Sequence, residues 1–118
     1  MYNIKDNVVA LATSPGLSAI NVIRCSGPDV LKIIKRILVK KNQLRPNYCF
    51  LSFIMDPETR EMVDQCMVVP FLKPKSYTGQ DMVEISIHGG RAISEKMIGL
   101  LNKQGCRIAE RGEFTYRA

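Results

Sequence analysis

The segment Met82-Val83-Glu84-Ile85-Ser86-Ile87-His88 alternates strictly between two kinds of side chain. One face is apolar (Val83, Ile85, Ile87) and the other is partly polar (Met82, Glu84, Ser86, His88). Period-two alternation of this kind is typical of a β-strand with one side against a hydrophobic core. The segment therefore predicts a strand whose second face is available to line a site.

Working outward from this strand, the sequence predicts further strands and two main helices. Apolar residues at three- and four-residue spacing from Val30 to Leu38 predict an amphipathic helix, capped by Ser26 or Gly27. A second helix is predicted from Arg91 to about Gln104, where a glycine ends it. The other predicted strands are 8–11, 19–24, 48–55, 63–71 and 106–109, and a last helix begins near residue 112.

The order of these elements predicts the fold class. The loop between 48–55 and 63–71 is too short for a crossover helix, so these two strands are predicted to form an antiparallel hairpin. The order β-β-α-β-β-β-α-β-(α) predicts an α+β domain, in which helices pack on a mixed or antiparallel sheet.

Length and composition are those of one globular domain. The chain has 118 residues, of which 46% are hydrophobic and 24% charged, and we expect residues 1–118 to form a single domain. No apolar run approaches the roughly 20 residues that span a bilayer, so no membrane association is predicted. The N-terminus lacks the pattern of a secretory signal, and we expect a cytoplasmic protein.

The positive charge is concentrated in one stretch. The net charge is +6, and residues 32–45 contain basic residues without any acid. These are Lys32, Lys35, Arg36, Lys40, Lys41 and Arg45. Such a stretch is either a solvated helix face with its exit loop or a patch that binds a polyanion such as RNA. An RNA-binding module is therefore an alternative prediction for this domain.

The sequence predicts no metal site and no disulfide. Its four cysteines form no CxxC pair, and the single histidine does not complete a zinc site with them at a familiar spacing. Without a secretory signal, reduced and buried thiols are the expected state. The positions concerned are Cys25, Cys49, Cys66 and Cys106.

No catalytic residue is predicted within this chain. The patterns GxxxxGK[ST], GxGxxG, HExxH and GxSxG are all absent. Ser86 or Cys66 could pair with His88, but nothing in the local sequence supplies a third group to orient the imidazole. A histidine beside Gly-Gly at a strand end favours a structural hydrogen-bonding role.

Glu84 is the most informative polar residue, because it lies in the middle of an apolar strand. A carboxylate there needs a partner or solvent. The partner could be Arg24, Arg91, or a ligand whose guanidine-like edge, as in pterin or guanine, donates two parallel N–H bonds. Arg24 could bind a carboxylate or phosphate, or pair with Glu84. The loop 76–79 suits either a tight turn or the rim of a ligand site.

Four ordered groups of residues resemble the N-terminal domain of the MnmE (TrmE) family of tRNA-modifying GTPases. They are VALATSPG (9–16), INVIRCSGP (20–28), SYTGQDMVEI with HGG (76–85 and 88–90), and RIAERGEFT (107–115). The sequence departs from the usual family pattern at Leu17-Ser18, Gln80 and Arg111. The resemblance implies a fold similar to the tetrahydrofolate-binding domains of one-carbon enzymes.

The resemblance also implies a ligand and a homodimer. In that family the domain dimerises and binds a tetrahydrofolate derivative, 5-formyl or 5,10-methylene, near the dimer interface. The family's folate-contacting arginine and glutamate fall on Arg24 and Glu84. Thr78, Gly79 and His88 lie in the same motifs and are further candidate folate contacts.

For the longer parent protein, the resemblance implies an enzyme. Such a protein would hydrolyse GTP with magnesium and potassium in a separate domain. It would act with the flavin- and NADH-using protein MnmG (GidA) to modify the C5 position of wobble uridine in tRNA, as a carboxymethylaminomethyl-type change. The present chain would supply folate binding and dimerisation, without catalysis of its own.

Overall fold

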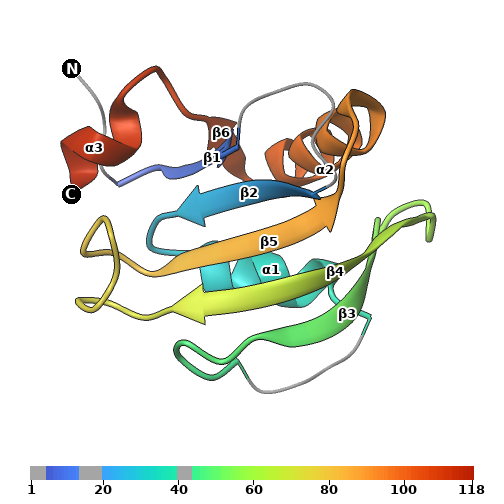
Figure 1. Cartoon of the computed structure of the whole chain (residues 1–118), viewed down its shortest axis with the longest axis horizontal. Helices are drawn as coiled ribbons and strands as arrows, with labels where there is room; N and C mark the ends of the chain where they lie inside the picture. The colour runs from blue at the N-terminus through green and yellow to red at the C-terminus, as the bar shows by residue number, and fades with distance from the viewer. Residues whose placement is uncertain (1–4, 14–19, 40–43) are drawn as a thin grey trace.

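A computed structural model of the chain describes residues 5–13, 20–39 and 44–118. A six-stranded sheet with the strand order β3-β4-β5-β2-β1-β6 forms its centre (Figure 1). β1 and β6 pair in parallel and the other neighbours pair antiparallel, so the sheet is mixed. The strands are β1 (Asn7–Leu11), β2 (Ile20–Ser26), β3 (Phe50–Met55), β4 (Met62–Phe71), β5 (Met82–His88) and β6 (Cys106–Ile108).

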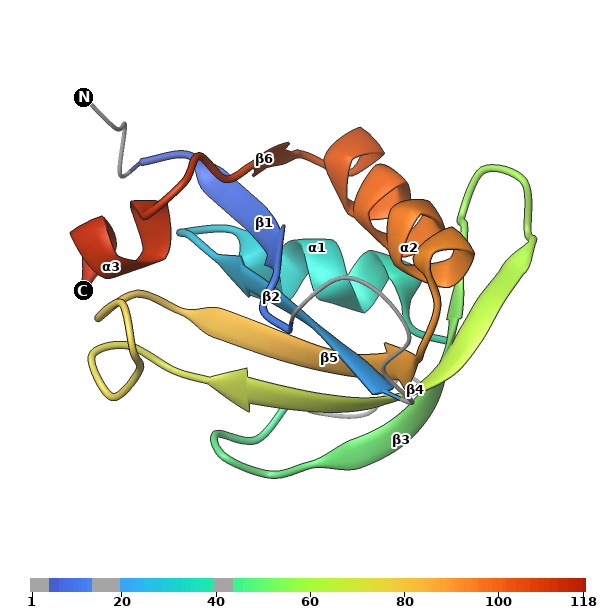
Figure 2. The ribbon, with the colours of Figure 1, turned by 45° about the horizontal axis from the view of Figure 1, so that its top comes forward.

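Two helices cover one face of the sheet, and the core lies between these helices and the sheet. These are α1 (Val30–Ile37) and α2 (Arg91–Lys103), and a short α3 (Glu113–Arg117) lies beside the start of β1 (Figure 2). The buried core unites helix residues such as Ile34 and Met97 with the inward residues of β5, Val83, Ile85 and Ile87. The α+β class and the antiparallel β3–β4 hairpin predicted from the sequence are thus confirmed.

The opposite face of the sheet, here called the open face, is not covered by α1 or α2. Its apolar residues are strongly exposed: the residues Ile20, Leu51, Phe53 and Met67 retain 60%, 48%, 45% and 41% of their accessible surface. They alternate along the strands with buried residues of the core face, as period-two patterning requires. The open face therefore carries both apolar surface and the polar positions of β5.

Several element ends differ from the prediction. β3 begins at Phe50 instead of Tyr48, which is exposed. Asp29 occupies the N-cap position of α1, where Ser26 or Gly27 was predicted. Ser26 instead ends β2, and its buried hydroxyl bonds to Thr78 (2.8 Å) and Gln80 (2.9 Å). The prediction failed there because the partners of Ser26 are more than fifty residues away in the sequence.

Some residues singled out in the sequence fall outside the described part of the chain. These are 14–19, which include Leu17-Ser18, and 40–43, which include Lys40 and Lys41. Among the described residues, no helix has the length and apolar character needed to cross a membrane.

Candidate functional site

An ion pair between Arg24 and Glu84 lies on the open face, where β2 and β5 run side by side. The two residues are direct cross-strand partners. Arg24 Nε donates to Glu84 Oε2 at 2.8 Å and Nη2 lies 2.6 Å from the same oxygen. Their side chains keep 31% and 27% exposure, so the pair is open to solvent from one side. Of the partners considered for Glu84, the structure therefore supplies Arg24, while Arg91 lies 4.0 Å from Glu95.

Both contacts of Arg24 fall on one oxygen of the carboxylate. Within the described residues, Glu84 Oε1 has no hydrogen-bond partner. The residues next to the pair along the same row of the sheet are Ala10 on β1 and Val69 on β4, neither of which competes for the carboxylate. A ligand with parallel N–H donors could therefore reach Glu84 from the open face.

Tyr77 forms the wall beside Arg24. The guanidinium carbon of Arg24 lies 5.7 Å from the centre of the Tyr77 ring, within the range of a cation–π contact. The hydroxyl of Tyr77 is 3.1 Å from that of Thr115 on α3, so the ring contacts Arg24 through its face and α3 through its hydroxyl. The sequence predicts a turn or a ligand-site rim at 76–79, but no local pattern indicates the contact between Tyr77 and Arg24.

Thr78 and Gly79 occupy the loop before β5 in different ways. Thr78 is buried, and its hydroxyl is engaged by Ser26 (2.8 Å) and by the backbone N–H of Gln80 (3.2 Å). Gly79 is exposed and has a φ of 78°, a left-handed conformation that favours glycine. It lines a separate cavity together with Lys5 and Lys73. Neither residue is brought into contact with the Arg24–Glu84 pair, so their predicted role in ligand binding stays a prediction.

His88 lies at the end of β5, on the same face as Glu84. Asp64 holds it by two contacts: the His88 backbone N–H donates to Oδ2 (2.9 Å), and Nδ1 of the ring lies 2.8 Å from Oδ1. The Asp64 side chain is 10% exposed, whereas the imidazole is 70% exposed. The local sequence indicates no group that orients His88. Asp64 is that group, and it was missed because it lies 24 residues away, on β4.

A groove of about 250 Å³ on the open face is lined by His88 together with residues of β2, β3, β4 and β5. Its walls include apolar Ile20, Leu51 and Met67 and polar Gln65, Ser86 and His88. A concave, mainly apolar surface with a few polar groups is the usual form of a small-molecule site. The groove adjoins the Arg24–Glu84 row, because Ser86 is paired with Val22 and Met67 on the neighbouring strands.

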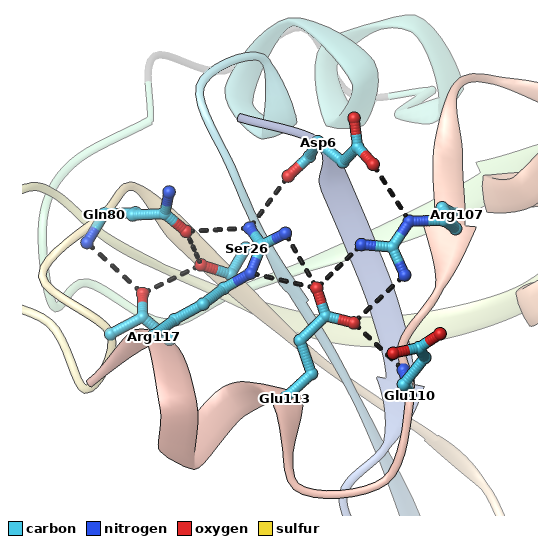
Figure 3. A network of polar contacts seen from close by, with 8 residues as sticks. Asp6, Ser26, Gln80, Arg107, Glu110, Glu113 and Arg117 are labelled. Atoms are coloured by element: carbon cyan, nitrogen blue, oxygen red, sulfur yellow. Dashed lines mark hydrogen bonds and ion pairs between the residues drawn. The ribbon is translucent and has the colours of Figure 1, made fainter. Parts of the chain in front are cut away.

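A buried charge network ties α3 to the rest of the domain (Figure 3). Glu113 has no exposed surface, and its carboxylate accepts two bonds from Arg107 (3.0 and 2.7 Å) and one from Arg117 Nη2 (2.9 Å). Arg117 also donates to the backbone oxygen of Asp6 (2.8 Å) and to Gln80 Oε1 (3.0 Å). The network therefore joins the start of β1, α3 and the loop that carries Tyr77.

Residues 7–118 match the family described as GTP-binding protein TrmE N-terminus. This chain belongs to the TrmE N-terminal family. The match extends over all the described elements, including the segments with Arg24, Glu84 and Glu113.

Named relatives of this TrmE N-terminal domain are long GTPases. The chain is 44% identical over 113 residues to the tRNA modification GTPase MnmE of Thermotoga petrophila and 42% identical over 118 residues to that of Thermus thermophilus. It is 39% identical over 115 residues to the probable tRNA modification GTPase MnmE of Cyanidioschyzon merolae. These alignments cover 96%, 98% and 98% of this chain, but 25%, 27% and 26% of the relatives. The chain thus spans about a quarter of their length.

Proposed function

We propose that this chain is the tetrahydrofolate-binding and dimerisation domain of a cytoplasmic tRNA-modifying GTPase. Membership of the TrmE N-terminal family and the names of the relatives support the parent activity. The observation that carries the ligand assignment is the Arg24–Glu84 pair, which is partly exposed on the open face and has one carboxylate oxygen unused by the described residues.

The chemistry of this pair suits a reduced folate. The pterin ring of tetrahydrofolate presents a 2-amino group and an adjacent ring N–H, which form two parallel donors. A carboxylate accepts such a pair of bonds in the same way as it accepts a guanidinium. Glu84 would anchor this edge with Oε1 and share Oε2 with Arg24, whose charge would favour an anionic ligand. The ligand would be the 5-formyl or the 5,10-methylene derivative.

Calorimetry tests this assignment on the chain itself. We expect 5-formyltetrahydrofolate to bind, and Glu84→Ala to weaken binding by about 1–3 kcal/mol through loss of charge-assisted hydrogen bonds. Glu95→Ala is the matched control, because Glu95 is exposed and lies beside an arginine on α2, far from the open face of the sheet. Equal affinity of wild type and Glu84→Ala would contradict the role of Glu84, and absence of binding would contradict folate binding by this domain.

Dimerisation is assigned to the apolar part of the open face. Leu51, Phe53 and Met67 are exposed side by side on β3 and β4, since Leu51 is the cross-strand partner of Met67. Clusters of exposed large apolar side chains mark interaction surfaces. A second copy of the chain seated there would place each ligand groove beside the interface. Because the groove shares Leu51 and Met67 with this surface, ligand binding and dimerisation would be linked.

Sedimentation equilibrium tests the dimer. We expect a mass of twice the 13.3 kDa of one chain at micromolar concentration. Phe53→Lys should reduce it to that of one chain, because a charge in the centre of the interface remains unpaired. The control is Met62→Lys, an equally exposed apolar residue at the far end of β4. A mass of one chain for the wild type at every concentration would contradict the proposal.

For the longer protein, the proposal includes the enzyme activity. GTP hydrolysis, with its magnesium and potassium, belongs to another part of such a protein, since this sequence has no GxxxxGK[ST] pattern. Modification of the wobble uridine at C5, together with MnmG (GidA), would use the folate bound here as one-carbon donor. Loss of that modification in a strain carrying Glu84→Ala, with unchanged GTP hydrolysis by the purified protein, is the expected result.

Direct RNA contact by the basic stretch 32–45, which begins on α1, is the second candidate. It is favoured by the exposure of Lys32, Lys35 and Arg36, which lie together on the outer side of this helix. That side faces away from the open face, so RNA bound there would not meet the Arg24–Glu84 pair. Binding of tRNA that falls steeply with salt, and falls further in a Lys40→Gln, Lys41→Gln variant, would support this candidate. Salt-independent or absent binding would exclude it.

A further inference from the structure

We infer that His88, oriented by Asp64, forms the second anchor of the ligand site, opposite Glu84 along β5. The inference rests on the proposed folate function. It adds His88 and Asp64 to the ligand site and gives the direction in which the ligand lies, from Glu84 toward His88 along β5. His88 would accept a hydrogen bond from an N–H or O–H group of the bound ligand through Nε2. Asp64 would be a positioning residue that acts through the imidazole.

The hydrogen bonds around the imidazole determine which nitrogen is available. Asp64 binds both the backbone N–H of His88 and Nδ1 of its ring, so the ring cannot turn without breaking a contact of 2.8 Å. A carboxylate at Nδ1 stabilises the tautomer that carries its proton there. Nε2 of the neutral ring is then a hydrogen-bond acceptor, and within the described residues it has no partner.

The polar groups of the groove have free hydrogen-bonding capacity. Among the described residues, the Ser86 hydroxyl and the Gln65 amide have no side-chain hydrogen bond, and both line the groove with His88. Apolar Ile20, Leu51 and Met67 complete the walls. Polar groups at the edges and apolar surface between them fit a flat heteroaromatic ligand with donors and acceptors on its rim.

The spacing along β5 matches a ligand of two ring systems. Glu84, Ser86 and His88 share one face of the strand, and the four residues from Glu84 to His88 span roughly 13 Å at the usual strand rise. A pterin joined to an aminobenzoyl group is a ligand of this length. With its guanidine-like edge on Glu84, the remainder would extend through the groove toward His88.

The first experiment examines Asp64 and His88 without a ligand. His88 is the single histidine of the sequence, so a long-range ¹H–¹⁵N spectrum reports on it alone. At alkaline pH we expect the shifts of a ring protonated at Nδ1, and in Asp64→Asn the averaged shifts of two tautomers. The matched control is Asp56→Asn, a carboxylate of similar burial that bonds to Lys103. Unchanged shifts in Asp64→Asn would overturn the positioning role.

The second experiment adds 5-formyltetrahydrofolate. At saturation we expect the His88 Nε2 resonance to move, and His88→Ala to lower the affinity about 5-fold, as loss of one hydrogen bond predicts. Asp64→Asn should lower it by a smaller factor and Asp56→Asn should leave it unchanged. If Glu84→Ala weakens binding but His88→Ala does not, the second anchor fails while the proposed function stands. If the wild type does not bind the ligand, the proposed function and the second anchor both fail, and the tautomer spectrum still decides the role of Asp64.

Discussion

Arg117 and Glu113 form an ion pair whose two side chains have no exposed surface. Arg117 Nη2 lies 2.9 Å from Glu113 Oε2, one helical turn away on α3. Burial of two charges is costly, but here Arg107, the backbone N–H of Glu110 and the side chain of Gln80 supply the remaining hydrogen bonds. The pair therefore holds α3 against β1 and against the loop that carries Tyr77.

Removal of the Glu113 charge should destabilise the domain strongly. Glu113→Gln would leave Arg107 and Arg117 without their shared carboxylate, and we expect a loss of about 3–5 kcal/mol in the free energy of unfolding. Urea denaturation measures it. Glu95→Gln, at an exposed pair, should change the free energy by less than about 0.5 kcal/mol. A loss of that small size in Glu113→Gln would show that the network does not stabilise the fold.

The same carboxyl should make stability depend on pH in the acid range. Desolvation raises the pKa of Glu113, but the bonds from Arg107, Glu110 and Arg117 outweigh it and lower the pKa from 4.5 to about 2. Because the folded-state pKa is depressed, the stabilisation is complete above pH 4.5 and is lost as the pH falls toward 2. It amounts to on the order of 2 kcal/mol. Denaturation at several pH values should show a shallower decline in Glu113→Gln; equal slopes would contradict this.

Tyr77 should contribute to ligand affinity through its ring. Tyr77→Leu removes the cation–π contact with Arg24, and we expect 5-formyltetrahydrofolate to bind about 2- to 5-fold more weakly. Tyr77→Phe keeps the ring and loses only the bond to Thr115, so its affinity should stay close to that of the wild type. If Tyr77→Phe is as weak as Tyr77→Leu, the link to α3 and not the ring positions Arg24.

The four cysteines should differ sharply in reactivity. Cys49 is exposed, whereas Cys25, Cys66 and Cys106 are buried. Burial, and secondarily the charge of Asp64, raises the pKa of the Cys66 thiol to about 12. In the folded protein at neutral pH, a thiol reagent should therefore label Cys49 first and Cys66 only on unfolding. Mass spectrometry of the labelled peptides checks this, and rapid labelling of Cys66 would contradict its burial.

The local patterns of the sequence predicted the secondary structure well. Alternation over 82–88 and the three- and four-residue spacing from Val30 both correspond to elements with the predicted face buried. These patterns succeed because one face of each element packs on the same core. In α2 a polar residue, Ser94, is buried together with Met97, Leu100 and Leu101, and the side chain of Asn21 donates a hydrogen bond to it at 2.7 Å.

The site depended on contacts between distant segments, which local patterns do not specify. Arg24 and Glu84 are 60 residues apart, and their pairing follows from the register of β2 against β5. Both residues are predicted as site candidates from the sequence, in which their ion pair is one of several alternatives. No local pattern predicts that Asp64 or Tyr77 belongs to the site, because Asp64 lies in a predicted strand and Tyr77 in a predicted turn. Only the tertiary structure brings them to His88 and Arg24.

The most direct test of the folate assignment removes the donor from the ligand and the acceptor from the protein in turn. Calorimetry would compare 5-formyltetrahydrofolate with its 2-desamino analogue on the wild type and on Glu84→Ala. If Glu84 accepts a hydrogen bond from the 2-amino group, the wild type should bind the analogue about 10- to 150-fold more weakly than 5-formyltetrahydrofolate. The affinity for the analogue should then be nearly the same in Glu84→Ala as in the wild type. If replacing 5-formyltetrahydrofolate by the analogue lowers the affinity by the same factor in the wild type and in Glu84→Ala, Glu84 does not bind the 2-amino group. That result would contradict the proposed ligand site.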